Sequence, residues 1–240
     1  MASRAAALLA VLGLAACAAP APRPWMERDT ARSAPESPAR LPDVPDAFRA
    51  ELSGHSAFGC SLRGNAVYLG EGRFLTAAHL VDGIMSRLRN CAGAPMQTTI
   101  HYAGRDLPVR LLRMGEGYVE PGVGPLYRRG EDLALLQAPV TFSGPAALPC
   151  GDGPAPGQPV LVLSTERRQA VRAGAMMPES RAADGTYADI PMSLAQGESG
   201  SGVFDAESHC LLGIVSHRPN ATPTHSRIVP AAAIRAFLRG

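Results

Sequence analysis

One stretch of this 240-residue sequence decides its fold, namely Gln196-Gly197-Glu198-Ser199-Gly200-Ser201-Gly202-Val203. Glycine adopts backbone angles that are closed to other residues, so Gly197 and Gly200 would let a tight turn hold the Ser199 hydroxyl out. The backbone amides of Gly197 and Ser199 would then point into one pocket, where they would stabilise a developing oxyanion. Taken alone, a glycine- and serine-rich octet is more often a plain loop than an active site, so a nucleophilic role for Ser199 depends on partners elsewhere in the chain.

A nucleophilic serine needs two partners, because its hydroxyl reacts poorly near neutral pH. The partners are a histidine base and a carboxylate that orients the histidine. Upstream, Arg73-Phe-Leu-Thr-Ala-Ala-His79 is a short apolar run that ends in a histidine. Gly130-Glu-Asp132-Leu-Ala-Leu-Leu136 places an acid before another apolar run. The candidates therefore occur in the order His79, Asp132, Ser199.

These three segments resemble conserved blocks of the chymotrypsin-like (trypsin-fold) serine proteases: Thr-Ala-Ala-His, Asp-(Ile/Leu)-Ala-Leu-Leu and Gly-Asp-Ser-Gly-Gly-Pro, in that order. The resemblance runs from about Ser56 to the C-terminus and includes Gly213-Ile-Val-Ser216, which is similar to the family's substrate-pairing strand. The sequence departs from the family at Glu198, Ser201 and Gly202, but no triad residue is missing. The nucleophile elbow of the α/β-hydrolases does not fit, because Ser201 occupies its closing glycine position.

The resemblance implies an all-β fold of two six-stranded antiparallel β-barrels of chymotrypsin type, with a short C-terminal helix. It implies a catalytic triad of His79, Asp132 and Ser199, an oxyanion hole formed by the Gly197 and Ser199 amides, and no cofactor or metal. The activity implied is that of a serine endopeptidase acting on protein or peptide substrates. The irregular turn around Ser199 leaves an alternative open, a catalytically silent trypsin-fold lipoprotein that acts as a binding module.

Local patterns along the chain favour the same fold class. Short β-type runs separated by Gly, Pro and Asp predict strands. Their regular spacing is typical of an all-β barrel or sandwich. The Pro- and Gly-rich stretch Pro139–Pro159 is the expected crossover between the two halves. Apolar residues at helical spacing predict a helix over Pro230–Leu238. The predicted strands are 66–69, 73–76, 98–102, 108–114, 132–137, 160–164, 169–177, 186–192, 202–204, 211–216 and 227–229.

The first fifty residues predict export and anchoring. Residues 1–17 combine Arg4 with an apolar run, which is typical of a signal peptide. The run ends in Leu14-Ala15-Ala16-Cys17, which resembles the bacterial lipobox, in which the cysteine receives the lipid; an ordinary signal peptide is the alternative. Residues 18–50, rich in Ala, Pro and Arg, predict a disordered tether, and residues 51–240 form the expected protease domain. We therefore expect an envelope protein held to a membrane by its N-terminal lipid, on the periplasmic side in a Gram-negative cell.

The remaining cysteines, Cys60, Cys91, Cys150 and Cys210, predict two disulfides in an exported chain. Of the three possible pairings, the two-barrel fold implied by the resemblance favours Cys60 with Cys91 and Cys150 with Cys210, because each pair stays within or near one half. Free core thiols are the alternative. No two cysteines are close enough in sequence to suggest zinc. A net charge of +2, without any lysine, gives no sign of a nucleic-acid partner.

The resemblance also locates the substrate-binding residues. The floor of the specificity pocket falls six residues before the nucleophile, at Ser193, and one wall is formed by Ser216, His217 and Arg218. Because an unpaired cation on this floor would be costly and Ser193 carries no charge, we expect no preference for Arg or Lys. Small or medium uncharged residues are expected at the cleavage site, with an acidic residue as the second choice.

Glu198 precedes the nucleophile where the family usually has Asp or Asn. In the animal enzymes that acid pairs with an N-terminus freed by proteolysis. No Ile-Val-Gly-Gly start is present in this sequence. Glu198 is therefore expected to pair with an arginine or with water.

Overall fold

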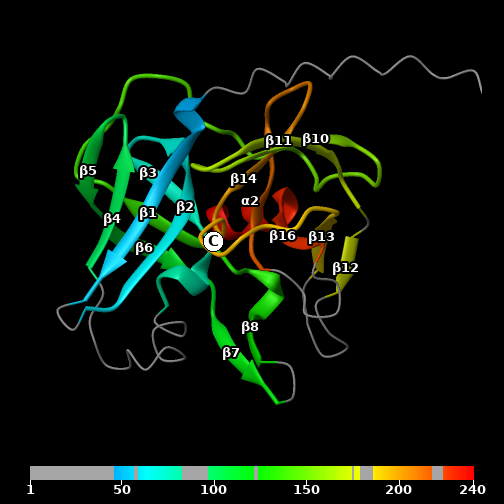
Figure 1. Cartoon of the computed structure of the whole chain (residues 1–240), viewed down its shortest axis with the longest axis horizontal. Coiled ribbons are helices and arrows are strands. Elements are labelled where there is room, and N and C mark those ends of the chain that lie inside the picture. The colour runs from blue at the N-terminus through cyan, green and yellow to red at the C-terminus, as the bar shows by residue number, and fades with distance from the viewer. Residues whose placement is uncertain are drawn as a thin grey trace, which may run out of the picture. The chain divides into compact units, whose positions relative to one another are not determined.

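The computed structural model describes residues 46–56, 59–82, 97–121, 124–174, 176–178, 186–217 and 224–240, and nearly all of its regular structure is β (Figure 1). The first sheet contains, in spatial order, β5 (Arg105–Pro108), β4 (Gln97–Tyr102), β1 (Arg49–His55), β2 (Ser61–Gly70), β3 (Arg73–Thr76), β9 (Ala134–Gln137) and β6 (Arg110–Met114). The second contains β11 (Arg168–Arg172), β10 (Pro159–Leu163), β14 (Gly202–Asp205), β15 (Leu211–Val215), β16 (Ser226–Pro230), β13 (Thr186–Ile190) and β12 (Met176–Pro178).

The two curled sheets, with antiparallel pairing between their neighbouring strands, confirm the predicted chymotrypsin-type architecture (Figure 1). Each described sheet has seven strands, where six were predicted. In the first sheet, β5 pairs with β4 through a two-residue turn in which Ala103 has φ 50° and Gly104 has φ 73°. Positive φ at both positions is what a tight hairpin turn requires. In the second sheet, the stretch predicted as one strand over 169–177 is divided into β11 and β12.

Three short 3-10 helices and one α-helix complete the described structure: η1 (Asp46–Phe48), η2 (Ala78–Leu80), η3 (Arg128–Gly130) and α2 (Ala231–Arg239). A separate hairpin of β7 (Gly117–Glu120) and β8 (Gly124–Tyr127) extends below the sheets in Figure 1. The local sequence pattern does not predict β1, β5, β7 or β8. Strand β1 begins at Arg49, two residues before the expected domain boundary, and Phe48 and Ala50 are buried.

One hydrophobic cluster joins the two sheets. Val67, Leu75 and other residues of the first sheet pack in it with Phe204, Ile214 and others of the second. Each sheet also has its own core, and that of the first contains the aromatic contact of Tyr68 with Phe74 and Tyr102. Because apolar burial is the main stabilising term in folding, the shared cluster fixes the two sheets against each other and hence the residues between them.

The crossover between the sheets runs from the end of β9 to the start of β10, which differs from the predicted stretch by one residue at each end. Cys150 in this crossover is bonded to Cys210, which confirms that predicted disulfide. Closing a loop of 60 residues stabilises the fold by about 4 kcal/mol in the chain-entropy account. Cys60 is also disulfide-bonded. Its predicted partner Cys91, like Cys17, lies outside the described residues.

Helix α2 matches the predicted C-terminal helix and packs through Ala231, Ile234 and Phe237. Pro230, predicted as the first residue of this helix, is the last residue of β16 and the N-cap of the helix. The guanidinium of Arg113, from β6 of the first sheet, lies 4.7 Å from the centre of the Phe237 ring. Over the described ranges, no helix is both long and apolar enough to cross a membrane.

Candidate active site

His79 and Asp132 are brought together by the pairing of β3 with β9. Thr76 lies opposite Ala134 in this pair, so residues just after β3 lie beside residues just before β9. His79 Nδ1 is 2.8 Å from Asp132 Oδ2, and the His79 backbone amide donates to Oδ1 at 2.9 Å. Both carboxylate oxygens therefore hold the histidine, one its ring and the other its backbone.

Asp132 is 2% exposed and also accepts a hydrogen bond from the Ser216 hydroxyl at 2.5 Å. Burial would raise the pKa of Asp132, but the charge of His79 and the hydrogen bonds from His79 and Ser216 lower that pKa to about 2. The carboxyl group is therefore ionised at neutral pH.

The pKa of His79 is raised above its ordinary value of 6.5. Burial lowers this pKa, but the charge of Asp132, the hydrogen bond to Asp132 and the charge of Asp82 together outweigh burial. Asp82, just after η2, accepts a hydrogen bond from the Tyr127 hydroxyl. The second carboxylate near His79 was not predicted, because it lies outside the His79 motif and its effect depends on the folded geometry.

Ser199 lies on the predicted turn, with Gly197 at φ 99° and Gly200 at φ 83°. A Cβ on Gly200 would lie 1.9 Å from the Asn65 carbonyl oxygen, so this position requires glycine for space as well as for conformation. The Ser199 hydroxyl donates to the Ser216 carbonyl oxygen at 3.2 Å. The described contacts contain no hydrogen bond between Ser199 and His79.

The backbone around Ser199 is held from the first sheet by Asn65 of β2. The Asn65 side chain donates to the Gly197 carbonyl oxygen at 2.9 Å and accepts from the Thr165 amide at 2.8 Å. The Asn65 backbone amide donates to the Ser199 carbonyl oxygen at 2.8 Å. As far as the described structure extends, the Gly197 and Ser199 amides donate to no protein acceptor. Two donors on one fixed turn can bind a ligand oxygen.

The role of Asn65 is not predicted by any sequence motif. It is 1% exposed, and a buried amide must find hydrogen-bond partners. Its partners Gly197 and Thr165 lie 132 and 100 residues away along the chain. The only sequence signal was an asparagine at the start of an apolar run, which identifies no partner.

Glu198 is fully buried and pairs with Arg167, whose Nε is 2.7 Å from Oε1, so the predicted arginine partner is confirmed. The Glu198 carboxylate also accepts from the Ala195 amide at 2.6 Å and from the Ser164 hydroxyl at 3.3 Å. A buried charge needs such partners, because removing one leaves an uncompensated charge. The salt bridge holds the residue before Ser199 without a new N-terminus.

The residues predicted to bind substrate are distributed around the second sheet. Ser193 is exposed and follows β13, Ser216 is buried after β15, and His217 is half-buried. Arg218 lies outside the described residues. Ser216 contacts Asp132 through its hydroxyl, and His217 contacts that same hydroxyl, whereas no described contact joins Ser193 to these residues.

Asp189 is the acid nearest in sequence to Ser193 and is largely buried. Its Oδ1 accepts from Arg227 Nη1 at 2.8 Å, and its Oδ2 lies 2.6 Å from His225 Nδ1. The charge of Asp189 is therefore already used within the protein. The described residues contain no cluster of three or more His, Cys, Asp or Glu side chains arranged to hold a metal ion.

The chain belongs to the trypsin-like peptidases, because the family's trypsin-like peptidase domain matches residues 64–214. The active form of the Rv3671c protease of M. tuberculosis has a similar structure, with TM-score 0.58 and 16% identity over 83% of this chain and 87% of that one. The HtrA-type protease AlgW with a decapeptide gives TM-score 0.56 and 16% identity over 81% of this chain and 64% of that one. The serine endoprotease of Yersinia pestis gives TM-score 0.55 and 16% identity over 81% of this chain and 62% of that one. No curated protein sequence matches the chain.

Proposed function

We propose that this trypsin-like peptidase is a serine endopeptidase that works through a triad of His79, Asp132 and Ser199. One observation carries the proposal: Ser216 joins Asp132 through its hydroxyl and Ser199 through its carbonyl, so the three candidates form one connected group. The raised pKa of His79 and the lowered pKa of Asp132 suit a base held by an ionised carboxylate.

The reaction begins when the Ser199 hydroxyl turns from the Ser216 carbonyl oxygen toward His79. Ser199 Oγ attacks the peptide carbonyl carbon while His79 Nε2 takes the hydroxyl proton, and Asp132 stabilises the resulting imidazolium. The oxyanion is stabilised by the Gly197 and Ser199 amides, which bind no protein acceptor within the described structure. His79 then gives its proton to the amine nitrogen, the peptide C–N bond breaks and the amine departs. The acyl group remains bonded to Ser199. A water molecule then attacks the acyl group through the same proton transfers, which releases the second product and restores the Ser199 hydroxyl.

A catalytically silent binding module is the second candidate. It is favoured by the hydrogen bond from Ser199 to Ser216, because that bond occupies the proton that His79 would have to accept. Catalytic hydrogen bonds in ligand-free serine hydrolases are often long and form only with substrate, so the endopeptidase is the better supported of the two. The two candidates differ in whether any peptide bond is cleaved.

A peptide library with one variable position tests the endopeptidase directly. We expect cleavage after small or medium uncharged residues, because Asp189 is paired with Arg227 and His225 and Ser193 is uncharged. Mass spectrometry of the products gives the preference. Rapid cleavage after Arg or Lys would contradict this specificity, and no cleavage of any member would favour the binding module.

We further propose that Cys17 carries a lipid that anchors the protein in the cell envelope. The support is the sequence Leu14-Ala15-Ala16-Cys17 at the end of an apolar run. Stable attachment needs more than one acyl chain, which bacterial lipoprotein modification supplies. Cys17→Ser is therefore expected to move the protein from the membrane fraction to the soluble fraction, measured by immunoblotting. Radiolabelled palmitate that fails to enter the wild-type chain would show that the proposal is wrong.

A further inference from the structure

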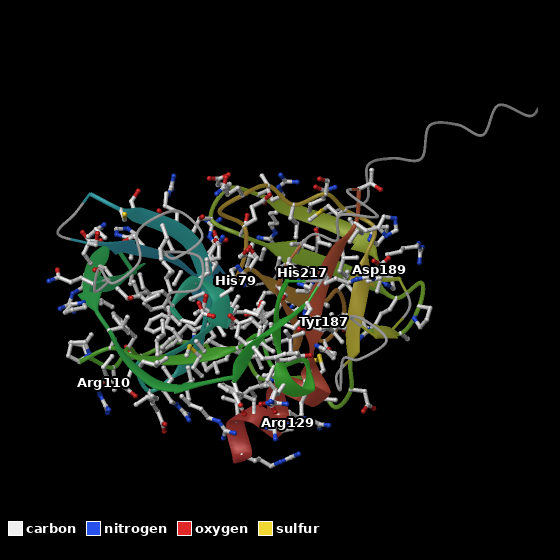
Figure 2. The ribbon with its side chains drawn as sticks, turned by 90° about the horizontal axis from the view of Figure 1, so that it is seen from below. His79, Arg110, Arg129, Tyr187, Asp189 and His217 are labelled. Carbon is white, nitrogen blue, oxygen red and sulfur yellow. A yellow bond between two sulfur atoms is a disulfide. The ribbon has the colours of Figure 1, made fainter. Side chains whose placement is uncertain are left out.

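A second histidine is connected to the carboxylate of Asp132. His217 Nδ1 lies 2.9 Å from the Ser216 hydroxyl oxygen, and that hydroxyl is 2.5 Å from Asp132 Oδ2. Asp132 Oδ2 is in turn 2.8 Å from His79 Nδ1. Three hydrogen bonds thus join the two imidazoles, and Figure 2 shows His79 and His217 as neighbours.

The protons in this chain of hydrogen bonds can be assigned. The Ser216 hydroxyl has one proton, and ionised Asp132 can only accept, so the short contact between them places that proton toward Asp132. Ser216 Oγ must then accept from His217, which requires a proton on His217 Nδ1. With the other tautomer, Nδ1 would compete with Asp132 for the Ser216 proton.

The His217 ring is held in place for this contact. It packs edge-on against Tyr187 of β13, with the ring centres 5.5 Å apart and the planes at 80°. The His217 carbonyl oxygen accepts from the Arg227 amide at 2.7 Å. The charged groups on the neighbouring strands are Asp189 of β13 and Arg227 of β16, which pair with each other, and the titratable His225 beside β16 also pairs with Asp189.

We propose that His217 is a positioning residue for the triad: its Nδ1–H donates to Ser216, which keeps the Ser216 proton on Asp132. This inference rests on the proposed endopeptidase function. Asp132 then receives three hydrogen bonds, from the His79 amide, the His79 ring and Ser216. The contribution of His217 depends on whether the group at its Nδ1 position donates or accepts.

His217→Asn and His217→Asp form the matched pair that tests this dependence. The Asn side chain places a donor at the same distance from Cβ as Nδ1, whereas Asp places an acceptor there. We expect His217→Asn to keep kcat/KM within about threefold of wild type. His217→Asp should lower kcat/KM by about tenfold or more, because an acceptor at this position draws the Ser216 proton away and Asp132 loses one hydrogen bond. Its kcat/KM profile should also shift to higher pH, because an added negative charge favours the His79 imidazolium. Equal losses in the pair would overturn the proposal.

Two further variants separate hydrogen bonding from other effects. If His217 only packs against Tyr187, His217→Phe would retain more activity than His217→Asn, which would overturn the proposal. A through-space charge effect is tested by a double-mutant cycle with Ser216→Ala, in which we expect the difference between the Asn and Asp variants to shrink. An undiminished difference would show that Ser216 does not carry the effect. His101→Asp, at an exposed histidine on β4, controls for a change from histidine to an acid.

A readout without turnover separates this proposal from the endopeptidase itself. In the Ser199→Ala background, NMR can follow the protonation of His79 in each variant. We expect the midpoint to be about one pH unit higher with His217→Asp than with His217→Asn, a tenfold change in proton affinity. Equal midpoints would overturn the role of His217 whether or not the wild-type enzyme cleaves peptides. Unequal midpoints whose difference shrinks with Ser216→Ala would, in an inactive wild type, support it and refute only the proposed function.

Discussion

Ser199→Ala is expected to lower kcat/KM for peptide hydrolysis by about a million-fold, the loss seen when a triad acts as a unit. The variant loses the Ser199 oxygen that forms the acyl-enzyme. The turn remains, because the Ser199 backbone is held by Asn65 and, within the described structure, the Ser199 hydroxyl has one partner, the neutral Ser216 carbonyl. The measurement is hydrolysis of the best library peptide at enzyme concentrations that would detect a residual rate.

A serine-directed phosphonate probe provides the control for this prediction. It should label wild type and Ser208→Ala but not Ser199→Ala, since Ser208 is an exposed serine in the turn after β14. Equal labelling of all three proteins would mean that another serine reacts. A wild-type protein that neither reacts with the probe nor cleaves peptides would favour the binding module.

Asp132→Asn is expected to lower kcat by roughly ten-thousand-fold, the magnitude found when a triad carboxylate becomes an amide. Asp132 accepts from His79 Nδ1 and from the Ser216 hydroxyl. An amide nitrogen facing Nδ1 would donate instead of accepting, so His79 would adopt the tautomer with its proton on Nε2. That nitrogen could then no longer accept the Ser199 proton.

The pH profile gives this prediction a second readout. His79 must be neutral to act as a base, so wild-type activity should fall as the pH drops through the pKa of His79, which lies above its ordinary 6.5. The Asp132 charge is the main cause that raises this pKa, so the midpoint of any residual Asp132→Asn activity should lie at lower pH. Asp106→Asn is the matched control, because Asp106 pairs with exposed His101 at the same 2.8 Å separation. A similar loss in the control would point to a general effect on folding.

Features that depend on neighbouring residues were predictable from the sequence. Strand β3 has the predicted bounds, and the C-terminal helix differs by one residue at each end, because β-type runs and helical apolar spacing are local signals. The three candidate motifs were found in the same way, since each is a short pattern. Strand β1 was missed because it begins at the end of the Ala- and Pro-rich stretch and contains a single large apolar residue, Leu52.

What the tertiary structure alone decided is how these local patterns meet. Asn65 holds Gly197 across 132 residues, and Ser216 reaches Asp132 across 84. Asp189, an acid close to the predicted pocket floor, proves to be paired with Arg227 from another strand. A sequence pattern shows which side chains can donate, accept or carry charge. Which of them are buried against one another depends on strand pairing between distant segments, and burial is what makes an unpaired polar group too costly to leave.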